Sequence, residues 1–528
     1  MVAGTLDKTE LERLERATNI AVTRILAKGT DDVFKPPVFA QSIESTILTE
    51  NPEGFRKDAT VQTIKFLKAG DLKKERIGPT RRGLVTKDHN SFRHVAWLDP
   101  FDATKYLATA CLLFEQIEAK RPAKADQIVH SHRSSDAEGE LFDTAFGYDS
   151  FRARSSEVSQ QSVGKWKVVT DIANFFDRIG NHSLENTLLN IGCEKKYVSL
   201  TREMLLFWAG DRRSFGVPVG SDASRILSEA VLLGVDTGLK AAGLNFIRYV
   251  DDFRIFADTR AEALKGVELL SNLLAEEGLY INSRKSDVFK IVDAAEAAQL
   301  ANKFVGEEHE KIDLEEKIEV KRAIRVSGRS TISRFYREPG KDALKKIKAI
   351  PKETIVREFL EASSSEVEQQ IKLVMKYFVY AEQDVSLLQV LLDRRITSIF
   401  YIADALDKEA SRFSAEKREE IKTAVFDAEQ WLKCAYPLQV PVLRISGHEA
   451  YREPKFVRAI VDAHLQSGSM LFFREAISFG YPCLDRAGLR KLAIDVFGNV
   501  PDFVQRAIYL AVKDHPDLSE DEKRPLLK

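Results

Sequence analysis

The chain has few cysteines and lacks a long apolar run. Its four cysteines stand far apart and form no CxxC pair, so neither a disulfide framework nor a zinc ribbon is expected. No stretch approaches the roughly 20 apolar residues that a membrane span requires. The N-terminus is charged and helix-like, which is not typical of a secretory signal. We therefore expect a protein of the reducing cytoplasm without a membrane partner.

Low-complexity linkers and repeats of fixed period are also missing, and a net charge of −1 gives no sign of a polyanionic partner. The length of 528 residues predicts two or three domains. Strand-like and helical segments alternate up to about residue 290, which indicates an α/β or α+β domain. Beyond about residue 300 the pattern is helical, which predicts an all-helical domain of stacked helix pairs.

One strand-like segment carries two adjacent carboxylates. In FIRYVDDFRIFAD, residues 246–258, Asp251 and Asp252 stand at the turn between two short apolar strands. Like charges repel, and their burial is unfavourable unless a divalent cation binds there. A third carboxylate, Asp171, ends the apolar strand in KVVTDIANFFDRI. Carboxylates at strand ends can converge on two cations, as in-line phosphoryl transfer requires.

Four segments resemble, in order, the catalytic blocks of a reverse transcriptase palm. DIANFFDRI, GVPVGSDASRILSEA, YVDD and NSRKSD begin at residues 171, 216, 249 and 282. The resemblance covers roughly residues 60–300. It implies that Asp171, Asp251 and Asp252, with the backbone carbonyl of Ile172, bind two Mg²⁺ ions, which Mn²⁺ can replace.

The same resemblance implies contacts to a deoxynucleoside triphosphate. Phe176 would pack against the sugar and exclude a 2′-hydroxyl; the alternative is an ordinary core residue beside Phe175. Gly220 would allow the backbone close to the nucleotide, and Lys285 would place a cation near the triphosphate. SFRHVAWLDP resembles the fingers strand whose arginine holds the triphosphate, which makes Arg93 and Lys87 candidates. Either cation can instead belong to the solvated surface.

Two features depart from the sequence pattern of most reverse transcriptases and argue against ordinary templated copying. Val219 stands where many reverse transcriptases have glutamine, and the preceding loop lacks the APTSP-like text of retron and group II intron enzymes. A palm followed by some 200 helical residues resembles the bacterial abortive-infection (Abi) reverse transcriptases. This implies an α+β fold with fingers and palm, then an all-α HEAT-like domain in place of a thumb. The expected domains are 1–60, an N-terminal helical segment, 61–300, fingers and palm, and 301–528, the helical repeat.

The Abi resemblance implies an antiphage enzyme that polymerises DNA without a template. It also implies that the single-stranded product stays attached to the protein and that the protein forms homo-oligomers. Two alternatives stay open. One is a templated RNA-directed DNA polymerase of retron or group II intron type, which would bind RNA. The other is a palm that binds nucleic acid without catalysis, although such a scaffold has no physical reason to keep three mutually repelling carboxylates.

Two stretches are rich in cations. Residues 65–93 hold nine Lys or Arg against three acids, and residues 317–352 hold twelve against three. The second stretch includes Phe335 and Tyr336 and follows the palm, where a thumb would lie. Cations and aromatic rings together can hold phosphates and stack on bases, so we predict that it binds the single-stranded product. The alternative is a pair of solvated helix faces.

Replacing Arg329, Arg334 and Arg337 with Gln tests this prediction. We expect weaker single-stranded DNA binding, shorter product and a flatter dependence of affinity on salt, because fewer phosphate contacts release fewer counterions. Binding is measured by fluorescence anisotropy over a salt series, and product length on a denaturing gel. Unchanged length and salt dependence would show that the stretch is only surface.

Overall fold

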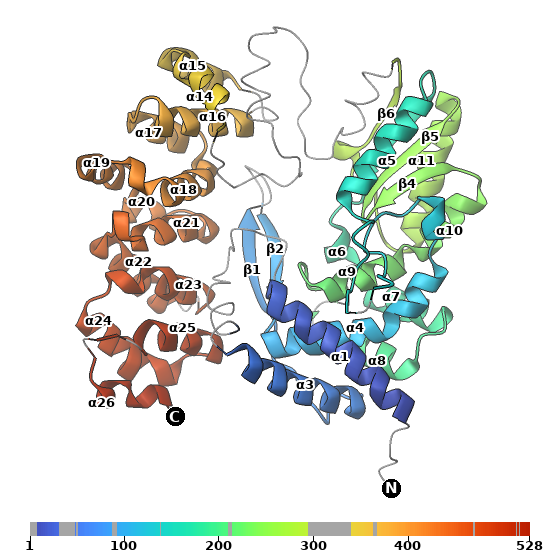
Figure 1. Ribbon diagram of the computed structural model, residues 1–528, viewed down its shortest axis with the longest axis horizontal. Helices are drawn as coiled ribbons and strands as arrows, with labels where there is room; N and C mark the ends of the chain where they lie inside the picture. The colour runs from blue at the N-terminus through green and yellow to red at the C-terminus, as the bar shows by residue number, and fades with distance from the viewer. Residues whose placement is uncertain are drawn as a thin grey trace. The chain divides into compact units, whose positions relative to one another are not determined.

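The computed structural model describes residues 8–30, 48, 51–86, 92–137, 139–209, 214–293, 339–362, 367–467, 470–513, 515–516 and 518–527. The chain forms two compact units. The first comprises Met1–Val33, Glu44–Arg82 and Val95–His309, and the second comprises Phe34–Ile43, Gly83–His94 and Glu310–Lys528. Figure 1 traces the elements of both units.

A four-stranded antiparallel sheet, in the order β4-β5-β3-β6, lies in the first unit (Figure 1). Its strands are β3 (Trp166–Asp171), β4 (Asn245–Tyr249), β5 (Asp252–Ala257) and β6 (Asp287–Lys290). They are rich in β-branched and aromatic residues, which favour a pleated, buried surface. Tyr249 pairs with Asp252, so β4 and β5 form a hairpin with a two-residue turn. The paired strands expected around Asp251 are confirmed.

The segment from residue 279 to 291, whose sequence LYINSRKSDVFKI resembles a strand, pairs more sparsely. Ile281 makes an isolated bridge to Ile172, and a 3-10 turn, η2 (Ser283–Lys285), follows before β6 begins. The Ser286 hydroxyl donates a hydrogen bond to the Asn282 backbone carbonyl over 2.8 Å. This side-chain bond takes the place of the bond that the carbonyl would make to a neighbouring strand. This turn places the NSRKSD block at the end of β3.

Helices cover both faces of the sheet. Helix α11 (Arg260–Glu276) contributes Leu270 to the core that holds Phe253 of β5. On the opposite face, Phe151 of α5 (Tyr148–Gln161) packs with Phe256 of β5 in a smaller cluster. The two phenylalanines are three positions apart on β5 and therefore face opposite sides.

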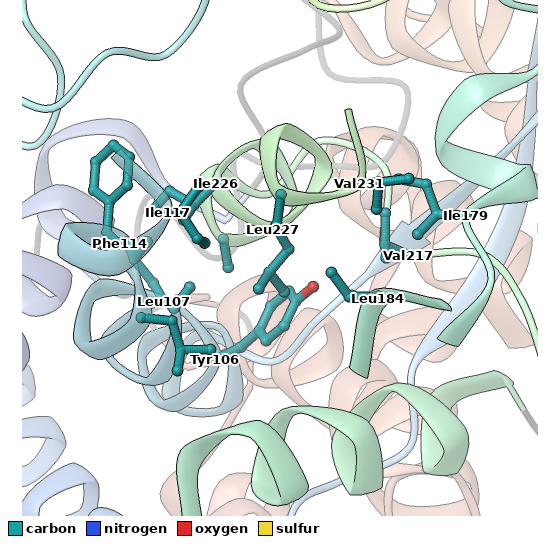
Figure 2. Close-up of a cluster of buried hydrophobic side chains, with 14 of the residues drawn as sticks. Tyr106, Leu107, Phe114, Ile117, Ile179, Leu184, Val217, Ile226, Leu227 and Val231 are labelled. Atoms are coloured by element: carbon teal, nitrogen blue, oxygen red, sulfur yellow. The ribbon is translucent and has the colours of Figure 1, made fainter. Parts of the chain in front are cut away.

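The largest core of the unit forms where helices pack beside the sheet. Figure 2 shows side chains of α4 (Pro100–Lys120), including Tyr106 and Leu107, close to Ile226 and Leu227 of α9 (Asp222–Val231). The Tyr106 hydroxyl lies 3.2 Å from the Ser224 hydroxyl, so its polar end is hydrogen-bonded within the core. The other helices here are α6 (Phe175–Arg178), α7 (Asn181–Asn190), α8 (Lys195–Ala209) and α10 (Leu233–Ala241).

Two N-terminal helices, α1 (Lys8–Lys28) and α3 (Pro52–Ala69), pack against α4 in the same unit. Asn51 caps α3 by accepting a hydrogen bond from the Gly54 amide, and Gly70 ends the helix in a left-handed conformation. The helix therefore runs without a break through residue 60, where the sequence suggests a domain boundary. Separately, β1 (Arg81–Thr86) and β2 (Phe92–Trp97) form a two-stranded sheet.

From residue 339 onward, all described elements are helices, as the periodicity predicts. They stack in chain order along the column at the left of Figure 1, and α23 contacts α21, α22 and α25. Their bounds are α14 (Lys341–Lys348), α15 (Lys352–Glu361), α16 (Val367–Tyr380), α17 (Ser386–Arg394), α18 (Ile399–Lys408), α19 (Ala415–Val425), α20 (Ala428–Leu432), α21 (Tyr436–Gly447), α22 (Pro454–Ser467), α23 (Met470–Gly480), α24 (Arg486–Lys491), α25 (Asp502–Val512) and α26 (Glu520–Lys523). Within the described ranges, no helix has both the length and the apolarity to cross a bilayer.

Candidate active site

The sheet brings together the three carboxylates that the sequence suggests. Asp171, the last residue of β3, lies directly opposite Asp252, the first residue of β5. Opposite residues of antiparallel strands share a face and have Cβ atoms about 4.5–5.5 Å apart. Asp251 precedes Asp252 in the turn, and its backbone carbonyl accepts a hydrogen bond from the Ile172 amide over 3.2 Å. The turn is thereby tied to the end of β3.

The turn that carries two of these carboxylates has an unfavourable backbone. Val250 has a φ of 54°, whereas Asp251, the second turn residue, is not in the left-handed region. Positive φ at the first central position alone is typical of a type II′ hairpin turn, which normally has glycine there. A β-branched residue in this conformation is strained by roughly 1–3 kcal/mol. Contacts elsewhere in the fold must therefore stabilise the turn.

Burial and mutual repulsion oppose ionisation of the turn carboxylates. Burial, followed by the charges of Asp171 and Asp252, raises the pKa of Asp251 well above its ordinary value. Burial also raises the pKa of Asp252 to about 6, and the charge of Asp171 adds to the rise, although Arg254 opposes both. At neutral pH these groups ionise at a free-energy cost, which a bound cation would offset.

Two cations and an amide border the cluster. The Lys285 ammonium lies 3.3 Å from the Asp171 carboxylate, to which Asn282 donates over 3.1 Å. Burial would lower the pKa of Lys285, but the three nearby carboxylates together raise it. The Arg254 guanidinium lies 4.0 Å from the Asp252 carboxylate. The structure thus brings Lys285 to the carboxylate cluster.

Sequence reasoning did not single out Asn282 or Arg254. Asn282 opens the NSRKSD block, so its place in that block is a usable signal. Arg254 stands two positions after Asp252 on a strand and therefore on the same face. That periodicity would have placed it beside the carboxylate.

An ion network buried beneath the turn was also missed. Arg248 of β4 donates through Nε and Nη2 to the two oxygens of Asp236, over 2.8 and 2.5 Å, and through Nη2 to Glu229 over 2.9 Å. Arg121 donates to the same Glu229 oxygen over 3.0 Å. Burial raises the pKa of Asp236, whereas for Glu229 the two guanidiniums outweigh burial and lower the pKa. A lone arginine inside an apolar strand was the available signal, because arginine is rarely buried unpaired.

Two of the predicted nucleotide contacts, Phe176 and Gly220, lie at or next to the start of a helix. The Phe176 ring is half-buried, and its centroid lies 5.3 Å from that of the buried Phe175 ring. The backbone carbonyl of Phe176 accepts a hydrogen bond from the Val217 amide over 3.0 Å. The first and second sequence blocks are therefore adjacent. Gly220 has a φ of 108°, which favours glycine, and precedes Ser221, the N-cap of α9.

Some predicted residues cannot be placed beside the carboxylates. Arg93 belongs to β2, but its side chain is not among those described. The remaining candidates fall outside the described residues: Lys87, Arg329, Arg334, Phe335, Tyr336 and Arg337.

The carboxylate cluster offers oxygen atoms of the kind that magnesium binds. Oxygen ligands from one or two carboxylates, completed by substrate phosphates and water, are what Mg²⁺ usually takes. In the part of the chain that the structure describes, no group of three or more His, Cys, Asp or Glu side chains is arranged so that it could hold a metal ion. A bound cation would nevertheless favour the ionised forms of Asp251 and Asp252, because its charge would oppose the burial and repulsion that raise their pKa values.

Comparison with known families identifies the region around the cluster. Residues 127–321 match the family described as reverse transcriptase (RNA-dependent DNA polymerase). This range includes all four sequence blocks and the three carboxylates, so the resemblance to a reverse transcriptase palm is confirmed. No curated protein matches the chain.

Solved structures similar to the chain include telomerases from two Candida species. The chain is 13% identical to Candida albicans telomerase in complex with a TWJ fragment of telomeric RNA, with a TM-score of 0.31, covering 70% of this chain and 66% of that one. The chain is 14% identical to apo telomerase from Candida tropicalis, with a TM-score of 0.32, and the match covers 82% of this chain and 68% of that one. For the apo Candida tropicalis telomerase truncated from its C-terminal domain, the identity is 14% and the TM-score 0.30, and the match covers 40% of this chain and 51% of that one. TM-scores of this size do not establish a shared architecture.

We expect the metal-free protein to lose stability as the pH rises through about 6. The folded-state pKa of Asp252, about 6, lies above the ordinary carboxylate value of about 3.9. The folded state therefore binds this proton more tightly, and the resulting stabilisation is complete below about pH 4 and is lost as the pH rises through about 6. Asp252→Asn removes the titrating group, so its melting temperature in EDTA should fall less than that of the parent between pH 5 and 7.5.

Asp58→Asn is the matched control, because Asp58 is exposed on α3, away from the cluster. It should follow the parent across the pH range. If the melting temperature of Asp252→Asn fell with pH as much as that of the parent, the pH dependence could not be assigned to the carboxylate cluster.

Proposed function

We propose that this chain is a DNA polymerase of reverse transcriptase type that adds deoxynucleotides by two-metal phosphoryl transfer. The observation that carries the proposal is the register that sets Asp171 opposite Asp252, with Asp251 in the adjoining turn and Lys285 beside them. The match of residues 127–321 to the reverse transcriptase family supports it.

Each residue of the cluster then has a role. Asp171, Asp251, Asp252 and the carbonyl of Ile172 would hold two Mg²⁺ ions, with Mn²⁺ as a substitute. These ions, when bound, stabilise charge on the attacking and leaving oxygens. The side chain of Lys285 is 46% exposed, so its ammonium can turn from Asp171 towards a triphosphate. Arg93 or Lys87 would hold the same triphosphate from the fingers.

Sugar selection is assigned to Phe176. Its neighbour Phe175 is 2% exposed and fills the core, whereas the ring of Phe176 is only partly covered. The uncovered part can meet the sugar of a nucleotide and exclude a 2′-hydroxyl. Gly220, on the adjoining segment, would let the backbone approach the same nucleotide.

We further propose that synthesis needs no template. Val219 is buried and apolar beside Gly220, so no polar side chain is available at this position to hydrogen-bond a template base pair. The stacked helices after the palm support an Abi-type layout in which residues 301–528 form a HEAT-like domain in place of a thumb. By the same resemblance the enzyme acts in the cytoplasm in abortive infection, forms homo-oligomers and keeps its single-stranded product attached.

The templated alternative, an RNA-directed DNA polymerase of retron or intron type, has support of its own. The matched family is described as RNA-dependent. A non-catalytic nucleic-acid scaffold fits less well, because the register places like charges opposite one another at a cost that metal binding would offset.

Incorporation by the purified full chain tests these proposals. With Mg²⁺ and dNTPs, we expect product without added template, and we expect it to migrate with the protein on a denaturing gel. Asp251→Asn should reduce incorporation to background with the fold intact, because the variant loses a metal ligand. Asp258→Asn, an exposed carboxylate just after β5, should polymerise like the parent.

Product formed only with template would favour the templated alternative. No product under any condition would favour the scaffold, and normal polymerisation by Asp251→Asn would refute the active-site assignment.

Phe176→Ala should admit ribonucleotides, because the ring is proposed to occupy the space of a 2′-hydroxyl. The ratio of dNTP to NTP incorporation should fall at least tenfold, equivalent to about 1.4 kcal/mol. Phe175→Ala is the control, since that ring is buried in the core and should lower stability without changing the ratio. An unchanged ratio in an active Phe176→Ala enzyme would return Phe176 to the core.

A further inference from the structure

We propose that Arg248 is a positioning residue for the carboxylate turn. Its Nη1 donates a hydrogen bond to the Val250 carbonyl over 2.9 Å, and this contact holds Asp251 and Asp252 in their metal-binding geometry. The inference rests on the proposed function, since it concerns how that site keeps its shape.

The turn needs stabilising contacts from other residues, because its own backbone conformation is unfavourable. Val250 has a φ of 54°, in a region that β-branched residues rarely adopt. If the turn relaxed, Asp251 and Asp252 would move together, because they are the next two residues after Val250. The Asp251 carbonyl would then lose its hydrogen bond from the Ile172 amide.

Arg248 is itself fixed at its backbone. Its amide donates to the Ile128 carbonyl over 2.8 Å, and its carbonyl accepts from the His130 amide over 2.9 Å. Arg248 also pairs with Phe253 across the β4–β5 ladder. Strand β4 is therefore hydrogen-bonded at Arg248 to residues 128–130 on one side and paired with β5 on the other.

The side chain of Arg248 is equally constrained. It is 0% exposed, and its other donors bind Asp236 of α10 and Glu229 of α9. A guanidinium offers donors in a rigid planar fork, so binding Asp236 through two atoms orients the third towards Val250. A lysine at this position could not make this set of contacts.

The role is mechanical because the network is balanced in charge. The guanidiniums of Arg121 and Arg248 face the carboxylates of Glu229 and Asp236. Nearby Arg133 is likewise paired with Glu118. His132 contacts Glu229, and burial lowers the pKa of its imidazole, which favours the neutral form. Little net charge remains to act on the metal site.

Two charge-balanced double variants separate positioning from general stability. Arg248→Gln with Asp236→Asn removes the fork and its main partner together. Arg121→Gln with Glu118→Gln removes another pair from the same buried network but no contact to the turn. Mn²⁺ binding without nucleotide is followed by electron paramagnetic resonance, and hydrogen exchange of residues 245–257 by mass spectrometry.

We expect the Arg248 pair to weaken Mn²⁺ binding by about 10- to 100-fold, which is typical when a partner that orients metal ligands is lost. Exchange across the turn should accelerate in the same variant. The Arg121 pair should stay within about twofold of the parent in both measurements, even if its melting temperature falls equally. Equal effects of the two double variants would overturn the proposal.

Adding Val250→Gly to the Arg248 pair provides a rescue. Glycine adopts a positive φ without strain, so the turn should hold its shape unaided and Mn²⁺ binding should recover. A merely structural role of Arg248 predicts no recovery. If the parent binds Mn²⁺ no better than Asp251→Asn, the proposed metal chemistry fails, and hydrogen exchange of the turn alone then decides the role of Arg248.

Discussion

Asp171 and Asp252 face each other as like charges across the β3–β5 pairing, and the rest of the first unit has to overcome this repulsion. The register cannot slip by one residue to separate them, because a slip would turn Phe253 and Ile255 out of the core. Burial of these side chains therefore fixes the carboxylates in place. The free energy for a strained and charged site comes from apolar packing.

The site also depends on helices far away in the sequence. Arg248 connects the carboxylate turn to α9 and α10, and Arg121, just after α4, joins the same network. The helices whose apolar sides build the core in Figure 2 thus also supply the polar groups beneath the turn. Removing one charged partner from such a network is more costly than replacing a pair, since it leaves a buried charge uncompensated.

The second unit follows a simpler rule. Its helices are amphipathic, and each buries its apolar side against neighbours in the stack, as α23 does against α21, α22 and α25. Helices that contact mainly their neighbours can be added or lost without disturbing a sheet.

Local pattern in the sequence was enough to determine several features. The β4–β5 hairpin, the strand ending at Asp171 and the helical second unit follow from alternation and periodicity, because each depends on residues close together in the chain. Proximity of the four blocks could be expected only through their resemblance to a family. The strain at Val250 and the network of Arg248, Asp236 and Glu229 were decided by the tertiary structure. Pairings between distant residues leave no periodic signal, since burial of a charge depends on which helices pack over it.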